Sequence, residues 1–244
     1  MNAIETKNLT KKFKEHAAVR SLNLSIAQGE FFSLLGVNGA GKTTTIRMLT
    51  CLTLPTSGDA TLLGKSIVTQ AQEVKSLINL SPQETAVAPN LTVRENLEMI
   101  AGIYGYTSQA ARVRAAQMME TLALGKVESK KAKLLSGGWQ RRLSIAMSLI
   151  SDPKVLFLDE PTLGLDVLAR RELWEVIEIL RGKVTLVLTT HYLEEAQAIS
   201  DRIGIMAQGE LKALGTVTEL LAQTGANNFE DAFVAIATKS EQLQ

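Results

Sequence analysis

The sequence is poor in the features that mark several common protein classes. It has a single cysteine, Cys51, in 244 residues, so no disulfide can form within the chain, and a reducing compartment is expected. Its 26 lysines and arginines nearly cancel its 25 aspartates and glutamates, which leaves a net charge of +1. Such a balance gives no electrostatic case for wholesale binding of nucleic acid, and no nucleic-acid partner is expected.

Long apolar runs are missing as well. No stretch approaches the roughly 18 uncharged apolar residues of a membrane-spanning helix. The longest candidate, around residues 99–111, contains two glycines, Thr107 and Ser108. The first seven residues also lack the basic and apolar regions of a secretory signal. We therefore expect any membrane role to come through a separate partner protein.

The apolar pattern predicts an α/β fold with a helical insert, in a chain long enough for one large domain or two small ones. Alternation between Val19 and Ile26 predicts antiparallel strands near the start. Further along, strands and helices alternate, which indicates a largely parallel sheet; the buried strands are expected at residues 31–35, 77–80, 155–158 and 184–189. Between about 88 and 152 the pattern is helical, and Thr92 and Glu95 have the spacing of a capping box near its start.

The clearest chemical motif occupies residues 36–43, which read G-V-N-G-A-G-K-T. It matches G-x-x-x-x-G-K-[ST] between a predicted strand and a predicted helix, the context required of a phosphate-binding P-loop. Its glycines let backbone N–H groups curl around phosphate oxygens, and the helix adds its positive N-terminal end. Lys42 is expected to neutralise the β- and γ-phosphates of a nucleotide, and the Thr43 hydroxyl to ligate Mg²⁺. The other nucleotide contacts are assigned to Gly36, Asn38, Gly39, Gly41 and Thr44.

Two carboxylates follow the apolar strand predicted at residues 155–158. Ligands of α/β folds bind at the C-terminal edge of the sheet, so Asp159 and Glu160 are expected beside the P-loop. Asp159 is expected to hold Mg²⁺, directly or through water. A structural role for Glu160, such as pairing with a basic residue, is the alternative to a catalytic one.

A second phosphate-binding element lies at residues 135–140, which read L-S-G-G-W-Q. Ser136 can donate to a γ-phosphate, while Gly137 and Gly138 permit close backbone approach at a helix N-terminus. Read alone, the segment could be an ordinary helix cap. One nucleotide cannot easily touch both this element and the P-loop of one small domain, whereas a nucleotide sandwiched between two copies can.

Together these motifs resemble the ATP-binding-cassette (ABC) family, the nucleotide-binding subunits of ABC transporters. The resemblance spans nearly the whole chain. It implies one ABC domain, residues 1–244: a P-loop NTPase (RecA-like) α/β core at 1–87 and 153–244, an antiparallel β subdomain, and an inserted α-helical subdomain at about 88–152. No added regulatory domain of the kind found in some sugar importers is expected, since the chain ends soon after the cassette.

The resemblance also implies an activity and partners. Two subunits, in a homodimer or pseudo-dimer, would close around two Mg·ATP and hydrolyse them to drive a separate transmembrane permease. The chain would then sit on the cytoplasmic face of the plasma membrane through that permease. Segments at 82–84, 91–97 and 189–196 and the short tail resemble ATPases of bacterial drug, antibiotic or polysaccharide exporters.

Five positions take their roles from this resemblance. Glu160 matches the residue that polarises the attacking water, and Gln83 matches the Q-loop glutamine that reaches Mg²⁺ or that water. His191 matches the switch histidine on the γ-phosphate, and Asp166 matches the D-loop aspartate that crosses to the partner subunit. Phe13 falls where the family has an adenine-stacking aromatic, with simple packing as the alternative.

Plainer interpretations suit several other polar residues. The lysine-rich run at 130–133 is expected on a solvated face, with attraction of nucleotide phosphate as the alternative. Arg141 and Arg142 are expected on the exposed side of the helix that Ser136 opens. His16 is expected in a solvated loop, and Trp139 is expected to serve local packing.

Three other function classes stay open. A soluble ABC ATPase could act on a non-transport partner, such as an iron–sulfur assembly complex. A P-loop kinase or GTPase would leave Ser136 and His191 without a purpose. A non-hydrolysing binder would not need Lys42, Asp159 and Glu160 together.

Overall fold

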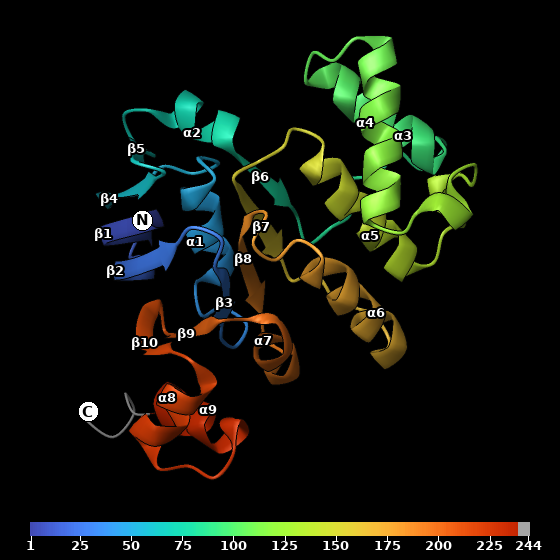
Figure 1. Ribbon diagram of the computed structural model, residues 1–244. Coiled ribbons are helices and arrows are strands. Elements are labelled where there is room, and N and C mark those ends of the chain that lie inside the picture. Colours follow the sequence, from blue (N-terminus) through green and yellow to red (C-terminus); the bar gives the residue numbers. More distant parts are fainter. Residues whose placement is uncertain (239–244) are drawn as a thin grey trace.

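Two β-sheets and a projecting group of helices make up the computed structural model, which describes residues 1–238 (Figure 1). The first sheet is antiparallel, in the order β2-β1-β4-β5. Its strands are β1 (Asn2–Phe13), β2 (His16–Ala27), β4 (Ser57–Leu62) and β5 (Lys65–Ser66). The last six residues of the predicted domain, including the end of the short tail, lie outside the described residues.

The second sheet forms the centre of the molecule, in the order β10-β9-β3-β8-β7-β6. Its strands are β3 (Phe31–Leu35), β6 (Ile78–Ser81), β7 (Val155–Asp159), β8 (Thr185–Thr190), β9 (Arg202–Ala207) and β10 (Glu210–Gly215). Neighbouring strands from β9 to β6 pair in parallel, and β10 runs antiparallel to β9. The largely parallel sheet predicted by the strand–helix alternation is therefore present.

Both faces of the central sheet are covered, which explains its unbroken apolar strands. In β7, Val155 and Phe157 join the core that contains α1 (Lys42–Leu49) and the antiparallel sheet. Leu156 and Leu158 point to the other face, where they join the core formed with α5 (Gly137–Leu149) and α6 (Val167–Glu178). A third cluster packs β9 and β10 against α7 (Leu193–Ile199), α8 (Val217–Thr224) and α9 (Phe229–Thr238).

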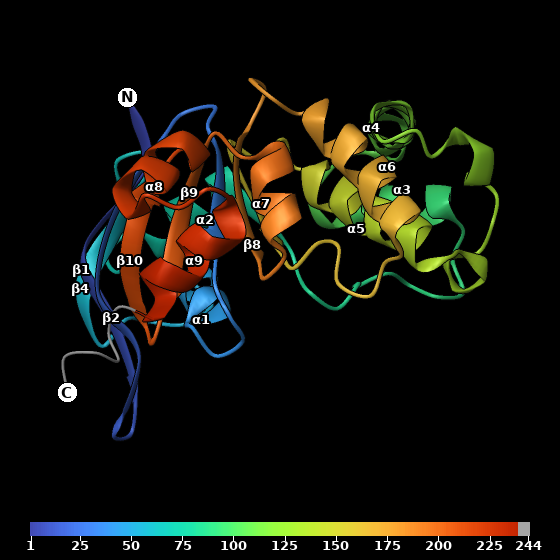
Figure 2. The same cartoon turned by 90° about the horizontal axis from the view of Figure 1, so that it is seen from below.

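The helical insert extends away from both sheets (Figures 1 and 2). It contains α3 (Val93–Ile103), α4 (Ser108–Thr121), two short 3₁₀ turns (Gly125–Val127 and Ala132–Leu134) and α5. The predicted capping box is present, since Thr92 accepts from the Glu95 backbone while the Glu95 side chain accepts from the Thr92 backbone. Helix α5 contacts α3 and α4 as well as β6 and β7, so it joins the insert to the core.

One helix has no counterpart in the sequence-based prediction. Helix α2 (Ala71–Leu77) buries only Val74, so its residues carry no amphipathic stripe that would announce a helix. No helix within residues 1–238 combines the length and apolarity needed to cross a bilayer.

Candidate active site

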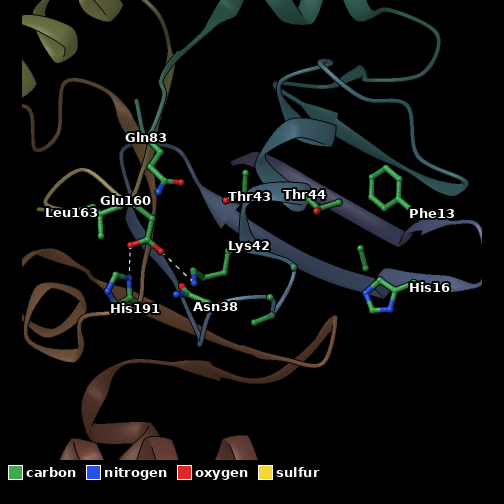
Figure 3. A pocket seen from close by; sticks show the side chains of 14 residues that line it. Phe13, His16, Asn38, Lys42, Thr43, Thr44, Gln83, Glu160, Leu163 and His191 are labelled. Atoms are coloured by element: carbon green, nitrogen blue, oxygen red, sulfur yellow. Dashed lines mark hydrogen bonds and ion pairs between the residues drawn. The ribbon is translucent and has the colours of Figure 1, made fainter. Parts of the chain in front are cut away.

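The candidate site lies where three neighbouring parallel strands end. In register, Leu35 of β3 pairs with Thr190 of β8, and Asp159 of β7 pairs with Thr189. The segments that follow these strands therefore leave the sheet side by side. They surround a cavity of about 420 Å³ (Figure 3). Its lining comprises Phe13, His16, Ala18, Asn38, Gly39, Ala40, Gly41, Lys42, Thr43, Thr44, Gln83, Glu160, Leu163 and His191.

The P-loop is held so tightly that two of its glycines admit no side chain. A Cβ on Gly36 would lie 2.3 Å from the Met206 carbonyl oxygen of β9. A Cβ on Gly41 would lie 2.4 Å from the Ala18 carbonyl oxygen, and Gly41 has φ +104°. Helix α1 begins directly afterwards at Lys42, so its N-terminal N–H groups face the cavity, where they favour an anion.

A chain of polar contacts joins three side chains that line the cavity, those of Lys42, Glu160 and His191 (Figure 3). The Lys42 ammonium donates to the Gly36 carbonyl at 2.7 Å and pairs with Glu160 Oε1 at 3.3 Å. The other carboxylate oxygen, Oε2, lies 2.7 Å from His191 Nδ1. Both members of the Lys42–Glu160 pair are almost fully buried, so their attraction is weakly screened by solvent. The basic partner anticipated for Glu160 is thus the P-loop lysine itself, which places the carboxylate where the phosphates of a nucleotide would lie.

Oxygen donors suited to Mg²⁺ gather beside this chain. Thr43 Oγ1 lies 3.2 Å from Asp159 Oδ1, and Thr189 Oγ1 donates to the same carboxylate oxygen at 2.5 Å. In the described part of the chain, no cluster of three or more His, Cys, Asp and Glu side chains could form an all-protein metal cage. Nucleotide-bound Mg²⁺ uses only one or two protein oxygens, together with phosphate and water. The donors present therefore fit that ion.

Gln83 enters the cavity from the segment after β6 (Figure 3). The Arg141 guanidinium of α5 donates to the backbone carbonyls of Pro82 and Gln83, at 2.6 and 2.5 Å. Burial lowers the pKa of Arg141, while the nearby carboxylates of Glu195 and Asp159 raise it. Arg141 thus fixes the backbone that carries Gln83.

The exposed positions predicted for Arg141 and Arg142 are wrong. Their exposed fractions are 4% and 8%, because α5 is packed between α3 and α4 of the insert and the core strands β6 and β7. Arg142 pairs with Glu172 Oε2 at 2.7 Å and lies 4.8 Å from the ring of Trp139. Trp139 packs against the core, as predicted. The lysine-rich run at 130–133 keeps its lysines on the surface, also as predicted.

Two residues from the turn between β1 and β2 form the far end of the cavity. Phe13 is 52% exposed and lines the cavity, so its ring is available for stacking rather than consumed by packing. His16 pairs with Phe13 across the turn and lines the same cavity. His16 is exposed, as predicted. The predicted loop position is wrong, because His16 is the first residue of β2. Its only sequence signal is that it stands three residues from Phe13.

The other predicted site residues lie on a separate face. Ser136 is exposed at the N-cap of α5 and makes no side-chain capping bond. Asp166 caps α6 by accepting from the Ala169 N–H at 2.9 Å. These two helix starts are neighbours, since a Cβ on Gly137 would touch Leu165 and one on Gly138 would touch Ala169, each at 3.4 Å. Ser136, Gly137, Gly138 and Asp166 do not line the cavity of their own chain.

Comparison with known proteins identifies relatives of this arrangement. The family model described as ABC transporter matches residues 19–163. The chain is 40% identical over 226 residues to the daunorubicin/doxorubicin resistance ATP-binding protein DrrA of Streptomyces peucetius, covering 92% of this chain and 68% of DrrA. It is 42% identical over 227 residues to the human phospholipid-transporting ATPase ABCA3, covering 91% of this chain but only 13% of ABCA3.

A solved structure extends the comparison to the fold. The ATP-binding cassette MJ0796, in a dimeric post-hydrolysis state bound to ADP and Pi, is 28% identical and superposes with a TM-score of 0.77. The match covers 87% of this chain and 98% of that one. The predicted fold, an α/β P-loop core with an antiparallel sheet and a helical insert, is confirmed.

Proposed function

The chain belongs to the ABC transporter family, and from this premise we propose that it is the ATP-hydrolysing subunit of an exporter. It works as a homodimer or pseudo-dimer on a separate transmembrane permease. One observation carries the proposal: Lys42, Glu160 and His191 form a continuous chain of contacts inside a cavity that the P-loop and Gln83 also line.

ATP is the nucleotide that this cavity accommodates. Its phosphates bind the P-loop, where Gly39, Gly41 and the start of α1 supply N–H donors and Lys42 supplies positive charge. The adenine stacks on the exposed ring of Phe13. Thr43 and Asp159 hold Mg²⁺, with Gln83 as a further oxygen donor. When bound, the metal supplies positive charge that offsets the charge on the phosphates.

Hydrolysis depends on Glu160 and His191. The Glu160 carboxylate orients the attacking water and accepts its proton, and the γ-phosphate replaces this carboxylate as the anionic partner of Lys42. The contact between His191 Nδ1 and Glu160 Oε2, at 2.7 Å, holds the carboxylate in place. Through this contact with the general base, His191 detects whether the γ-phosphate is present.

The second copy completes the site. Ser136, Gly137 and Gly138 lie outside the cavity of their own chain, beside Asp166 at the start of α6. An exposed serine and two glycines at a helix N-terminus suit the γ-phosphate of a nucleotide held by the partner. Two ATP molecules then join the subunits, and hydrolysis separates them. The output is mechanical because the closed and open dimers bind ATP and ADP with different affinities.

A groove beside Gln83 supplies the contact with the permease. It has a volume of about 210 Å³ and is lined by Asn79, Leu80, Pro82, Ala86, Ile100, Ile103, Tyr104, Ser144, Met147 and Ser148. Ile103, the last residue of α3, and the following Tyr104 are exposed residues that line it, with exposed fractions of 72% and 49%. The groove receives a cytoplasmic helix of the permease, which places the chain at the cytoplasmic face of the membrane. The export direction is supported by the relationship to DrrA, a drug resistance protein.

Phosphate release by the purified chain tests this function. We expect Mg·ATP hydrolysis by the native chain and its loss in Glu160→Gln, which keeps the size of the side chain but cannot accept the proton. Glu73→Gln, which changes an exposed carboxylate of α2, is the matched control and should hydrolyse normally. Normal hydrolysis by Glu160→Gln would show that another group is the base.

A further inference from the structure

A fully buried carboxyl, that of Glu195, lies beside the active site without a basic residue of the described chain in direct ion-pair contact, although its charge acts on Arg141 of α5 at longer range. Glu195 of α7 has an exposed fraction of 0%, and no ion pair found within residues 1–238 includes it. The Trp174 indole N–H of α6 donates to Glu195 Oε1 at 3.2 Å, while Oε2 has no hydrogen-bond partner among the described residues. Burial raises the pKa of Glu195, against the opposing effect of donors from Thr190, Trp174 and Thr162.

Fold stability alone does not call for a carboxyl at this position. Burying a carboxyl without a direct ion pair is costly, and apolar replacements of buried polar groups are often neutral or stabilising. Ala196 and Ile199, the other buried residues of α7, are apolar. A polar group retained at such a cost points to a role in the site that the helix serves.

The position of Glu195 relates it directly to the two catalytic side chains. Strands β7 and β8 pair in register up to Asp159 and Thr189, so the segments after them run on together. Glu160 and His191 make the first contact between these segments. Thr162, two residues after Glu160, has a fully buried hydroxyl that makes no hydrogen bond within the described chain. It lies near enough to the Glu195 carboxyl to oppose the rise of its pKa that burial causes.

Helices α6 and α7 contact each other at a second level. The Arg170 guanidinium of α6 lies 4.2 Å from the ring of Tyr192, and that ring lies 4.0 Å from the ring of His191. With the Trp174–Glu195 hydrogen bond, two consecutive turns of α6 therefore contact the N-cap and the first turn of α7. Movement of α7 relative to α6 would change the distance between His191 and Glu160.

We propose that Glu195 is a positioning residue for ATP hydrolysis. Its buried carboxyl accepts a hydrogen bond from Trp174 of α6, which ties the segment after His191 to α6 and so keeps His191 against Glu160. This inference rests on the proposed roles of His191 and Glu160. Glu195 does not touch the nucleotide, since it does not line the cavity.

Steady-state ATPase assays of the full chain test the proposal. Glu195→Gln keeps an acceptor for Trp174 and should retain kcat within about threefold. Glu195→Leu removes the acceptor and should lower kcat about tenfold or more, because small misplacements of catalytic groups are costly. The KM for ATP should change little in both variants. Trp174→Phe removes the donor alone and should lower kcat in the same way, with no further loss when combined with Glu195→Leu.

Asn96→Leu is the matched control. Asn96 is also fully buried and hydrogen-bonded, but it lies in the helical insert. The Asn96→Leu substitution should lower the melting temperature of the protein without a tenfold loss of kcat. Thermal unfolding of every variant shows whether a loss of turnover reflects unfolding, and Trp174→Phe carries the test if Glu195→Leu does not fold.

Each outcome distinguishes the inference from the function on which it rests. Turnover at the native rate in both Glu195→Leu and Trp174→Phe would overturn the positioning role, as would a raised KM with unchanged kcat. Equal losses in Glu195→Gln and Glu195→Leu would also overturn it, because the amide preserves the contact with Trp174. Native turnover in Glu160→Gln, assayed in parallel, would instead contradict the proposed function.

Discussion

Replacing Glu160 with glutamine should tighten the binding of ATP to a single chain while it stops hydrolysis. Glu160 Oε1 lies 3.3 Å from the Lys42 ammonium, and both side chains are more than nine-tenths buried. The γ-phosphate must displace this carboxylate from Lys42, so the ion pair competes with the nucleotide. Glutamine removes the negative charge and with it the competition.

The size of the effect follows from the geometry of the pair. At 3.3 Å and an effective dielectric constant of about 20, the attraction is about 5 kcal/mol. Most of this attraction energy is compensated when ATP binds. The separated Lys42 and Glu160 regain favourable interactions with phosphate or water, and Lys42 keeps its hydrogen bonds to the Gly36 and Val37 carbonyls. We expect a net gain of about 1–2 kcal/mol, which lowers the Kd for ATP about 5- to 30-fold.

Calorimetric titration with ATP measures this difference. The titration is done in a Ser136→Arg background, which blocks the sandwich and reports the affinity of one chain. Glu73→Gln in the same background removes a surface carboxylate outside the site, and this control should leave the Kd for ATP unchanged. An unchanged or higher Kd in Glu160→Gln would refute the competition between carboxylate and phosphate.

Three further predictions concern other parts of the site. In the same titration, Phe13→Ala should weaken ATP binding by about 1–3 kcal/mol through loss of adenine stacking, and Phe13→Tyr should not. Equal ATP affinities in the native chain and both variants would contradict the stacking role. Arg141→Gln should lower the free energy of unfolding in urea by about 2–3 kcal/mol, because the carbonyls of Pro82 and Gln83 lose a buried charged donor; an unchanged midpoint would contradict that. Ile103→Asp should reduce co-purification of a multi-span membrane protein, and undiminished recovery would argue against the groove as the docking site.

Much of this site can be predicted from sequence because its chemistry depends on local order along the chain. The P-loop fits only between a strand and a helix, and Asp159 and Glu160 follow a strand whose five residues are all buried. A parallel sheet brings such strand ends together, so the proximity of Glu160, His191 and the P-loop follows from the strand pattern alone. The helix cap at Thr92 can also be predicted from the sequence, because both of its hydrogen bonds form within one turn.

The remaining features depend on contacts between distant segments. Arg141 and Arg142 form a charged pair of the kind found on surfaces, and only the packing of α5 against the other insert helices and the core buries them. Glu195 likewise belongs to a polar run after His191, and its burial against Trp174 cannot be read from periodicity because α7 has only seven residues. His16 lines the cavity because the pairing of β1 with β2 sets it opposite Phe13. In each case tertiary packing overrides what the local sequence indicates.

Mixing two inactive variants tests most directly whether each ATP is enclosed by two chains. Lys42→Ala disables the P-loop, and Ser136→Arg disables the element that lies outside the cavity of its own chain. In a mixed dimer, Lys42 of one chain and Ser136 of the other rebuild one intact site, so an equimolar mixture should recover up to about a quarter of the native sites. Restored ATP hydrolysis on mixing is the predicted result. A mixture as inactive as its components, under conditions where the chains exchange, would contradict a site shared between subunits.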